Sequence, residues 1–241
     1  EALPMSPEIF HALVFWLPAF LFSITVHEAA HAWSAVRLGD PTGHLGGQVS
    51  LSPIPHIRRE PLGMLVVPLL TAITNGWAMG WASAPYDPAW AERYPRRAAW
   101  MAAAGPAANY CLAILSLILL RAGLAMGYFV SPQTVNINHL VGPAAGGEAG
   151  LAAFLAQGLS VLLMENAILG TFNLVPLPPL DGSAAIGLLL PEKAAASMRH
   201  LARSPQFSLV GLLVAWKVFP LVSTPLFSLM IRLVHPGVTY S

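Results

Sequence analysis

Apolar residues form long uninterrupted stretches along most of this chain instead of alternating with polar ones. Four stretches reach the roughly 20 residues that a membrane-spanning helix needs, and each contains at most one charged residue: 9–36, 98–120, 149–180 and 206–231. A fifth stretch, 62–83, has no charge but includes three glycines and Pro68, which interrupt helices. The pattern predicts an all-α polytopic membrane protein with about 4–6 membrane segments.

The composition supports a membrane protein and excludes several other classes. Hydrophobic residues make up 56% of the 241 residues and charged residues only 10%, against about 25% charged in soluble domains. The net charge of +1 gives no general field for nucleic acid, and the single cysteine, Cys111, excludes an internal disulfide framework. We expect one membrane domain over residues 1–241. Because the sequence begins at Glu1 and not at methionine, we expect that an N-terminal segment has been lost.

Basic residues divide the loops into two groups. Lys and Arg are absent from 1–8 and 131–148 but present in 37–61, 84–97 and 191–204. The positive-inside rule therefore places these three basic loops in the cytoplasm. Because both flanks of 62–83 are then cytoplasmic, we expect a re-entrant or interfacial segment there, with a full span as the alternative. The alternating residues Gln48, Val49, Ser50, Leu51 and Ser52 predict a short β-strand beside it.

Two histidines lie four residues apart near the end of the first apolar stretch, which reads His-Glu-Ala-Ala-His over 27–31. On a helix, His27 and His31 share one face and can bind one metal ion, while Glu28 is placed to take a proton from metal-bound water. The helical rise puts both histidines within about 15 Å of Arg37, inside the bilayer toward its cytoplasmic side. The alternatives are a polar cluster that joins helices and a proton relay.

A catalytic zinc ion needs a third protein ligand, and Asp181 is the strongest candidate. It follows a segment with three prolines, 173–180, that must end the fourth stretch and turn the chain back. The charge pattern brings this end to the same membrane side as His27 and His31. The alternative is that Asp181 caps a short helix over 183–190.

These motifs resemble the site-2 protease family of intramembrane zinc metalloproteases. The stretch 27–31 matches its zinc motif, and 172–182, with Asp181, is similar to the signature that supplies its third zinc ligand. The Gly-Pro-Ala-Ala-Asn sequence at 105–109 and the stretches 50–56 and 80–85 are similar to further family segments. The chain departs from the family at Ser52, 58–60 and Ser83, and it resembles a compact member without PDZ or CBS domains.

The resemblance implies hydrolysis of peptide bonds within the membrane. One Zn²⁺ per chain would be held by His27, His31 and Asp181, with Glu28 as general base. Asn173 and Asn109 are candidates for the oxyanion or for substrate binding, with interhelical hydrogen bonding as the alternative. The edge of the strand at Gln48, Val49 and Ser50 would hold an unwound substrate. His56 is a further candidate near the site, with a structural role as its alternative.

We expect a single-span membrane protein as substrate, a regulatory membrane partner, no nucleic acid, and a location in a prokaryotic plasma membrane. Three other readings of the motif remain. A zinc peptidase of the prenyl-protein type would take a downstream glutamate as its ligand. A metal or proton transporter would use the same polar residues as a conduction path, although they gather at one depth. An inactive zinc-binding scaffold would keep the ligands without the reaction.

Overall fold

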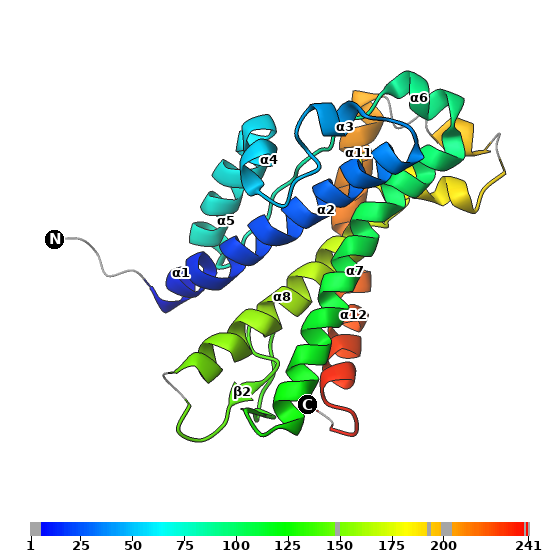
Figure 1. The fold of residues 1–241 in the computed structure, drawn as a ribbon. Coiled ribbons are helices and arrows are strands. Elements are labelled where there is room, and N and C mark those ends of the chain that lie inside the picture. Colours follow the sequence, from blue (N-terminus) through cyan, green and yellow to red (C-terminus); the bar gives the residue numbers. More distant parts are fainter. Residues whose placement is uncertain (1–5, 148–149, 192–193, 199–203, 239, 241) are drawn as a thin grey trace.

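The computed structural model describes residues 6–147, 150–191, 194–198, 204–238 and 240, and its main elements are helices (Figure 1). Three continuous helical stretches are long and apolar enough to cross a membrane: Pro7–Leu38, Pro95–Ala125 and Leu151–Asn173. The first is built from α1 (Pro7–His11), η1 (Ala12–Trp16, a π-helical turn) and α2 (Leu17–Leu38), and the others are α7 and α8. The all-α membrane fold predicted from hydropathy is confirmed.

The fourth apolar stretch forms a bent helix pair. α11 (Pro205–Val218) and α12 (Pro220–Val234) meet at Pro220, and their axes differ by 49°. The break follows from the lack of an N–H group on Pro220 and from the clash of its ring with the preceding turn. If the pair counts as one span, the described part of the chain has up to four.

Three helices form the centre of the fold: α7 packs against both α2 and α8 (Figure 1). Large side chains of the first span, Trp16 and Phe20, are fully buried in the same apolar cluster as Leu163 and Met164 of α8. On α7 the buried positions near the site are small, including Ala98, Ala102 and Gly105. Small side chains let the backbones of membrane helices approach closely, so α7 can lie directly against the histidine face of α2.

Residues 62–83 form a short helix followed by a segment that runs back along it. η2 (Leu62–Val66) and α5 (Val67–Asn75) form an apolar helix of Leu62–Asn75, which is shorter than the candidate spans. α5 ends at Gly76, whose φ of 75° reverses the chain. The returning segment is held along the helix, since the N–H of Trp81 donates to the carbonyl of Gly63 at 3.1 Å. Residues 62–83 thus form a short helix followed by a returning segment, and their re-entry into the membrane stays a prediction.

The predicted strand over 48–52 is wrong, because this segment is an irregular loop between α3 (Thr42–Leu45) and α4 (Pro53–Arg59). Side chains take the backbone groups that a strand would use. The N–H of Ser52 donates to the Ser50 hydroxyl, and the Ser50 carbonyl accepts from His56 Nε2, while the N–H of Gln48 donates to the Gly43 carbonyl at 2.8 Å. The described β-structure lies beyond the far end of α7, where β1 (Phe129–Val130) pairs antiparallel with β2 (Gly142–Pro143).

Asp40 joins the start of α3 to the segment before α6 (Pro88–Arg93). Its Oδ1 accepts from the N–H of Thr42 at 2.9 Å and from the Thr42 hydroxyl, and its Oδ2 accepts from the N–H of Asp87 at 2.8 Å. Burial raises the pKa of Asp40, but these hydrogen bonds outweigh that effect and hold the pKa below its ordinary value. The start of α3 is therefore held against the segment before α6.

Candidate metal centre

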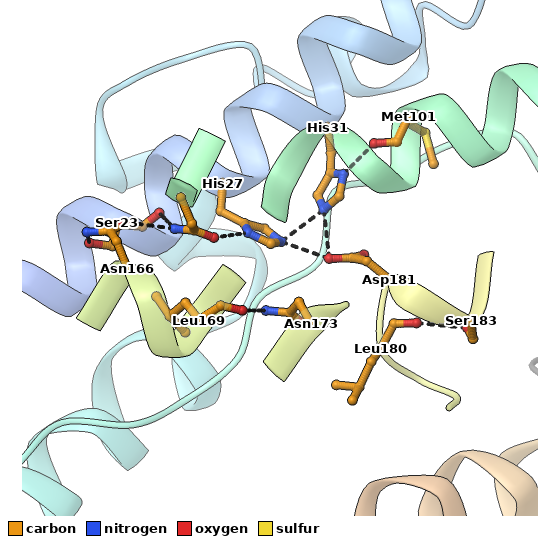
Figure 2. Close-up of polar contacts among 11 residues, drawn as sticks. Ser23, His27, His31, Met101, Asn166, Leu169, Asn173, Leu180, Asp181 and Ser183 are labelled. Atoms are coloured by element: carbon orange, nitrogen blue, oxygen red, sulfur yellow. Dashed lines mark hydrogen bonds and ion pairs between the residues drawn. The ribbon is translucent and has the colours of Figure 1, made fainter. Parts of the chain in front are cut away.

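Three potential metal ligands meet at the crossing of α2, α7 and the end of α8 (Figure 2). His27 and His31 lie one turn apart on α2, and Asp181 comes from the loop between α8 and α9 (Gly182–Ala185). Asp181 Oδ2 lies 3.0 Å from His27 Nε2 and 3.2 Å from His31 Nε2, and the two Nε2 atoms are 3.0 Å apart. The predicted cluster therefore brings Asp181 to His27, from which it is separated by 154 positions in the chain.

Each histidine is held by its other ring nitrogen. His31 Nδ1 lies 2.7 Å from the carbonyl oxygen of Met101 on α7. A carbonyl can only accept, so His31 Nδ1 carries the proton and Nε2 of the neutral ring presents its lone pair to the centre.

The tautomer of His27 is fixed by a longer chain of hydrogen bonds. Asn166 Nδ2 donates to the Leu162 carbonyl at 2.9 Å, which identifies Asn166 Oδ1 as the acceptor of the amide. Asn166 Oδ1 then accepts from Asn109 Nδ2 at 2.9 Å. Asn109 Oδ1 accepts from His27 Nδ1. His27 Nε2 is therefore also left with its lone pair toward Asp181 (Figure 2).

These protonation states fit a divalent metal ion. Two imidazole lone pairs and a carboxylate oxygen face one another at 3.0–3.2 Å, and such a group repels itself unless a cation lies between the atoms. In a tetrahedral zinc site with bonds of about 2.0–2.1 Å, neighbouring ligand atoms are about 3.3 Å apart. The donor set of two neutral histidines and one carboxylate also leaves a fourth position for water, as in catalytic zinc sites.

Asp181 does not act as the helix cap that was the alternative reading of its position. It precedes α9, but its backbone is helical and its side chain makes no capping hydrogen bond. The side chain points instead to the two histidines of α2 (Figure 2). The proline-containing segment after α8, which ends at Asn173, carries Asp181 back to that position.

Glu28 lies beside the cluster on α2 and is 3% exposed. Its Oε2 atom is buried and has no hydrogen-bond partner among the residues that the structure describes. A buried carboxylate oxygen without a partner costs free energy unless something binds it. The atom is thus available to take a proton, as the sequence motif predicts for a general base.

The other predicted site residues are distributed around this centre. Asn173 ends α8 and donates to the Leu169 carbonyl one turn earlier, so its amide nitrogen is engaged within its own helix. His56 on α4 is buried, lies close enough to Glu28 to interact electrostatically, and donates through Nε2 to the Ser50 carbonyl at 3.0 Å. Gln48, Val49 and Ser50 belong to the irregular loop before α4.

Asn109 lies behind His27. It is fully buried, and besides His27 its amide contacts Asn166 and the Ser23 carbonyl. The amide N–H groups of Asn109 are therefore engaged by other helices, which fits interhelical hydrogen bonding and not binding of the oxyanion. Sequence reasoning missed Asn166 and Ser23, whose only sequence signal is that polar residues in a membrane span are costly.

Gly105 explains part of the motif at 105–109. A Cβ atom placed on Gly105 would overlap Nε2 of both His27 and His31. A glycine at this point of α7 is therefore required to leave room for the two ligating nitrogens and for the metal between them.

Replacing Asn109 by Leu is expected to weaken zinc binding about 10- to 100-fold, because His27 loses the acceptor that fixes its tautomer. Competition with a chelating dye would measure the zinc affinity of the purified protein. Ser116→Ala is the matched control, since Ser116 is buried in the same helix but bonds only the Leu112 carbonyl. Equal zinc affinity in Asn109→Leu and the wild type would contradict the positioning role.

Replacing Gly105 by Ala is expected to remove most of the bound zinc, because the new methyl group occupies the space at the ligand atoms. Zinc content per purified chain measures this directly. Gly158→Ala in α8 is the control, where the added Cβ meets only the Phe15 ring, at 3.8 Å. Full zinc content in Gly105→Ala would show that the centre can move aside.

Comparison with known proteins gives a consistent result. The family model of peptidase family M50 matches residues 15–213. YwhC of Bacillus subtilis, named as a candidate zinc metalloprotease, is 32% identical over 181 residues, which cover 74% of this chain and 70% of YwhC. Rip2 of Mycobacterium tuberculosis, named in the same way, is 31% identical over 200 residues, 82% of this chain and 64% of Rip2. No solved structure gave a significant match.

Proposed function

Because the chain belongs to peptidase family M50, the site-2 protease family of zinc metalloproteases, we propose that it cleaves peptide bonds within the transmembrane segments of other membrane proteins. The observation that carries the proposal is that the candidate metal ligands lie on, or directly follow, helices long and apolar enough to cross a membrane. The centre is built on α2, within the candidate span Pro7–Leu38, and on the segment following the candidate span Leu151–Asn173. A substrate that reaches it is expected to be a membrane-embedded one.

His27, His31 and Asp181 would hold a zinc ion, which would supply Lewis-acid activation of water and of the scissile carbonyl. Glu28 takes the proton of the attacking water on Oε2 and later gives it to the leaving amine nitrogen. Asn109 and Met101 keep both histidines in the tautomer that binds metal, through the hydrogen bonds to their Nδ1 atoms. The surrounding apolar helices limit water around the carboxylate, which strengthens its interaction with the reacting groups.

A helical substrate must unwind before its backbone can react, since the peptide groups of a helix are hydrogen-bonded to one another. The loop before α4 is suited to hold an unwound segment. The backbone groups of Val49 and Leu51 form no hydrogen bond within the described part of the chain. An extended substrate backbone can pair with these alternate residues even though the loop is not a regular strand.

The basic loops support an orientation with the metal centre toward the cytoplasm, because α2 ends at Leu38, next to Arg37. The relatives are bacterial proteins, which supports a bacterial plasma membrane as the location. We propose a single-span protein as substrate, with cleavage releasing a regulatory fragment, and a further membrane protein that controls access to the site.

Purified protein reconstituted in vesicles with a panel of single-span reporter proteins tests the function. We expect cleavage within the apolar segment of a subset of reporters, identified by mass spectrometry of the products. Dialysis against a zinc chelator should remove the activity, and one equivalent of Zn²⁺ should restore it. Zinc-dependent transport across the vesicle membrane without any cleavage would instead support the transporter reading.

A further inference from the structure

A cavity of about 620 Å³ opens between the loop before α4 and the segment before α6, and its lining residues are distinct from the three metal-ligand candidates. Gly46, Gly47 and Gln48 line one side, and Pro55 with the two arginines that end α4 line another, with Pro85 opposite. The cavity adjoins the helix that carries the metal ligands. A Cβ added to Gly43, in α3, would meet Cβ of Ala32 on α2 at 3.0 Å and the carbonyl oxygen of Pro85 at 3.3 Å.

The charge of the cavity is one-sided. Arg58 and Arg59 line it, and none of its lining residues is acidic. The Nε of Arg59 donates to the Ser83 carbonyl at 3.0 Å, which holds this side chain against the segment that returns along α5. Arg58 forms no ion pair or hydrogen bond with the residues described. Two guanidinium groups in this arrangement favour a carboxylate ligand.

Gln48 indicates a second chemical group that a ligand of this cavity should have. Its side chain is 3% exposed, and its Nε2 donates to the Gly46 carbonyl at 3.3 Å and to the Pro55 carbonyl at 3.2 Å. Its Oε1 is buried without a partner among the described residues. An unsatisfied buried acceptor costs about 1–3 kcal/mol, so a ligand with an N–H group at this point is favoured. Peptides bring such a group, whereas a phosphate ion does not.

Two large apolar side chains near the cavity are exposed. Leu51, in the loop before α4, is 69% exposed, and Ile54, in α4 next to the cavity-lining Pro55, is 55% exposed. A ligand that fills the cavity with a charged residue can therefore place apolar residues on these two side chains. A transmembrane helix that is followed by an acidic residue presents this combination at its end.

We propose, on the basis of the proposed function, that this cavity binds the extended segment that follows the transmembrane helix of a protein substrate. An Asp or Glu side chain of that segment lies between Arg58 and Arg59, and one of its backbone N–H groups donates to Gln48 Oε1. The enzyme then selects substrates by an acidic residue on the flank nearest the cleaved bond, and not only by the apolar sequence.

Binding of model peptides tests this site without requiring cleavage. The probe is a fluorescent single-span peptide with an alanine-leucine helix, followed by Gly-Asp-Asp, Gly-Asn-Asn or Gly-Lys-Lys. The protein carries Glu28→Gln and is placed in nanodiscs of neutral phosphatidylcholine. We expect the Asp peptide to bind at least tenfold more tightly than the Asn peptide, since charge-assisted hydrogen bonds to arginine are lost in the latter.

Charge reversal identifies the residue responsible. Arg58→Glu should invert the order, so that the Lys peptide binds more tightly than the Asp peptide, and Arg58→Gln should abolish the difference. Arg96→Glu is the control, because Arg96 lies outside this cavity but on the same basic side of the chain. Zinc content and a monodisperse elution profile show that each variant is folded. An unchanged Asp preference in Arg58→Glu, or the same loss in Arg96→Glu, would overturn the proposal.

A second arm separates the peptide from an anionic lipid. Nanodiscs with one third phosphatidylglycerol should leave the Asp preference in place, and its disappearance there would assign the cavity to a lipid headgroup and overturn the proposal. Failure of the proposed function is recognised separately. A protein that binds zinc and prefers the Asp peptide but cleaves no reporter retains the acidic-segment site and loses only the protease assignment.

Discussion

Replacing Glu28 by Gln is expected to lower the rate of peptide cleavage by about 10²- to 10⁴-fold and to leave the bound zinc unchanged. The amide has nearly the shape of the carboxylate, but it cannot accept a proton from the attacking water. The metal ligands are separate residues, His27, His31 and Asp181, so the metal centre should persist. Zinc content and the rate of reporter cleavage are measured on the same preparation.

Glu165→Gln is the matched control for this experiment. Glu165 is also a buried acid within a candidate span, at 4% exposure, but it lies on α8 outside the ligand cluster. It should retain cleavage within a small factor of the wild type. If the Glu28 variant cleaved as fast as the Glu165 variant, Glu28 would not be the general base, and a different group would have to take the proton.

Replacing Asp181 by Ala is expected to weaken zinc binding roughly 10²- to 10³-fold and to abolish cleavage. The apparent binding free energy of structural zinc is about 10–16 kcal/mol over four ligands, so the loss of one ligand removes several kcal/mol. The two imidazoles that remain also lose the negative charge that faces them at 3.0 and 3.2 Å. Zinc per chain, measured after removal of loosely bound metal, gives the result, with His27→Ala measured in parallel.

Asp87→Ala controls for the general effect of removing an aspartate from the same basic side. Asp87 caps α6 by accepting from the N–H of Ala89 at 2.8 Å and does not approach the metal centre. This variant should lose some stability, about 1 kcal/mol, but keep its zinc. Full zinc occupancy in Asp181→Ala would separate the two distant motifs and return the histidine pair to the helix-joining reading.

Several features of the fold and the site followed from local pattern. The four apolar stretches predicted the three continuous spans and the bent pair, because hydrocarbon length sets how many apolar residues a crossing needs. The spacing of His27 and His31 predicted one shared face of α2, because the helical repeat is fixed. The prolines after Asn173 predicted a turn that frees Asp181, because proline cannot continue a helix.

The predicted strand at 48–52 fails for a reason that alternation cannot reveal. A strand needs free backbone groups along its length, and here the N–H of Ser52 donates to the Ser50 hydroxyl while the Ser50 carbonyl accepts from His56 Nε2. These bonds depend on where α4 places His56, which the alternation of residues along 48–52 does not encode.

The sequence by itself determined that this is a helical membrane protein with a His-Glu-x-x-His metal motif, since hydropathy and helical periodicity are local properties of the chain. Tertiary structure decided which atoms complete the site: Asp181 beside the histidines, Asn166 and Asn109 behind His27, and Gly105 clearing space for the metal. The tertiary structure also forms the cavity at Gln48 and Arg58. Such arrangements depend on how the helices cross and where the loops lie. The residues in contact are far apart in the sequence, so no local periodicity predicts that they meet.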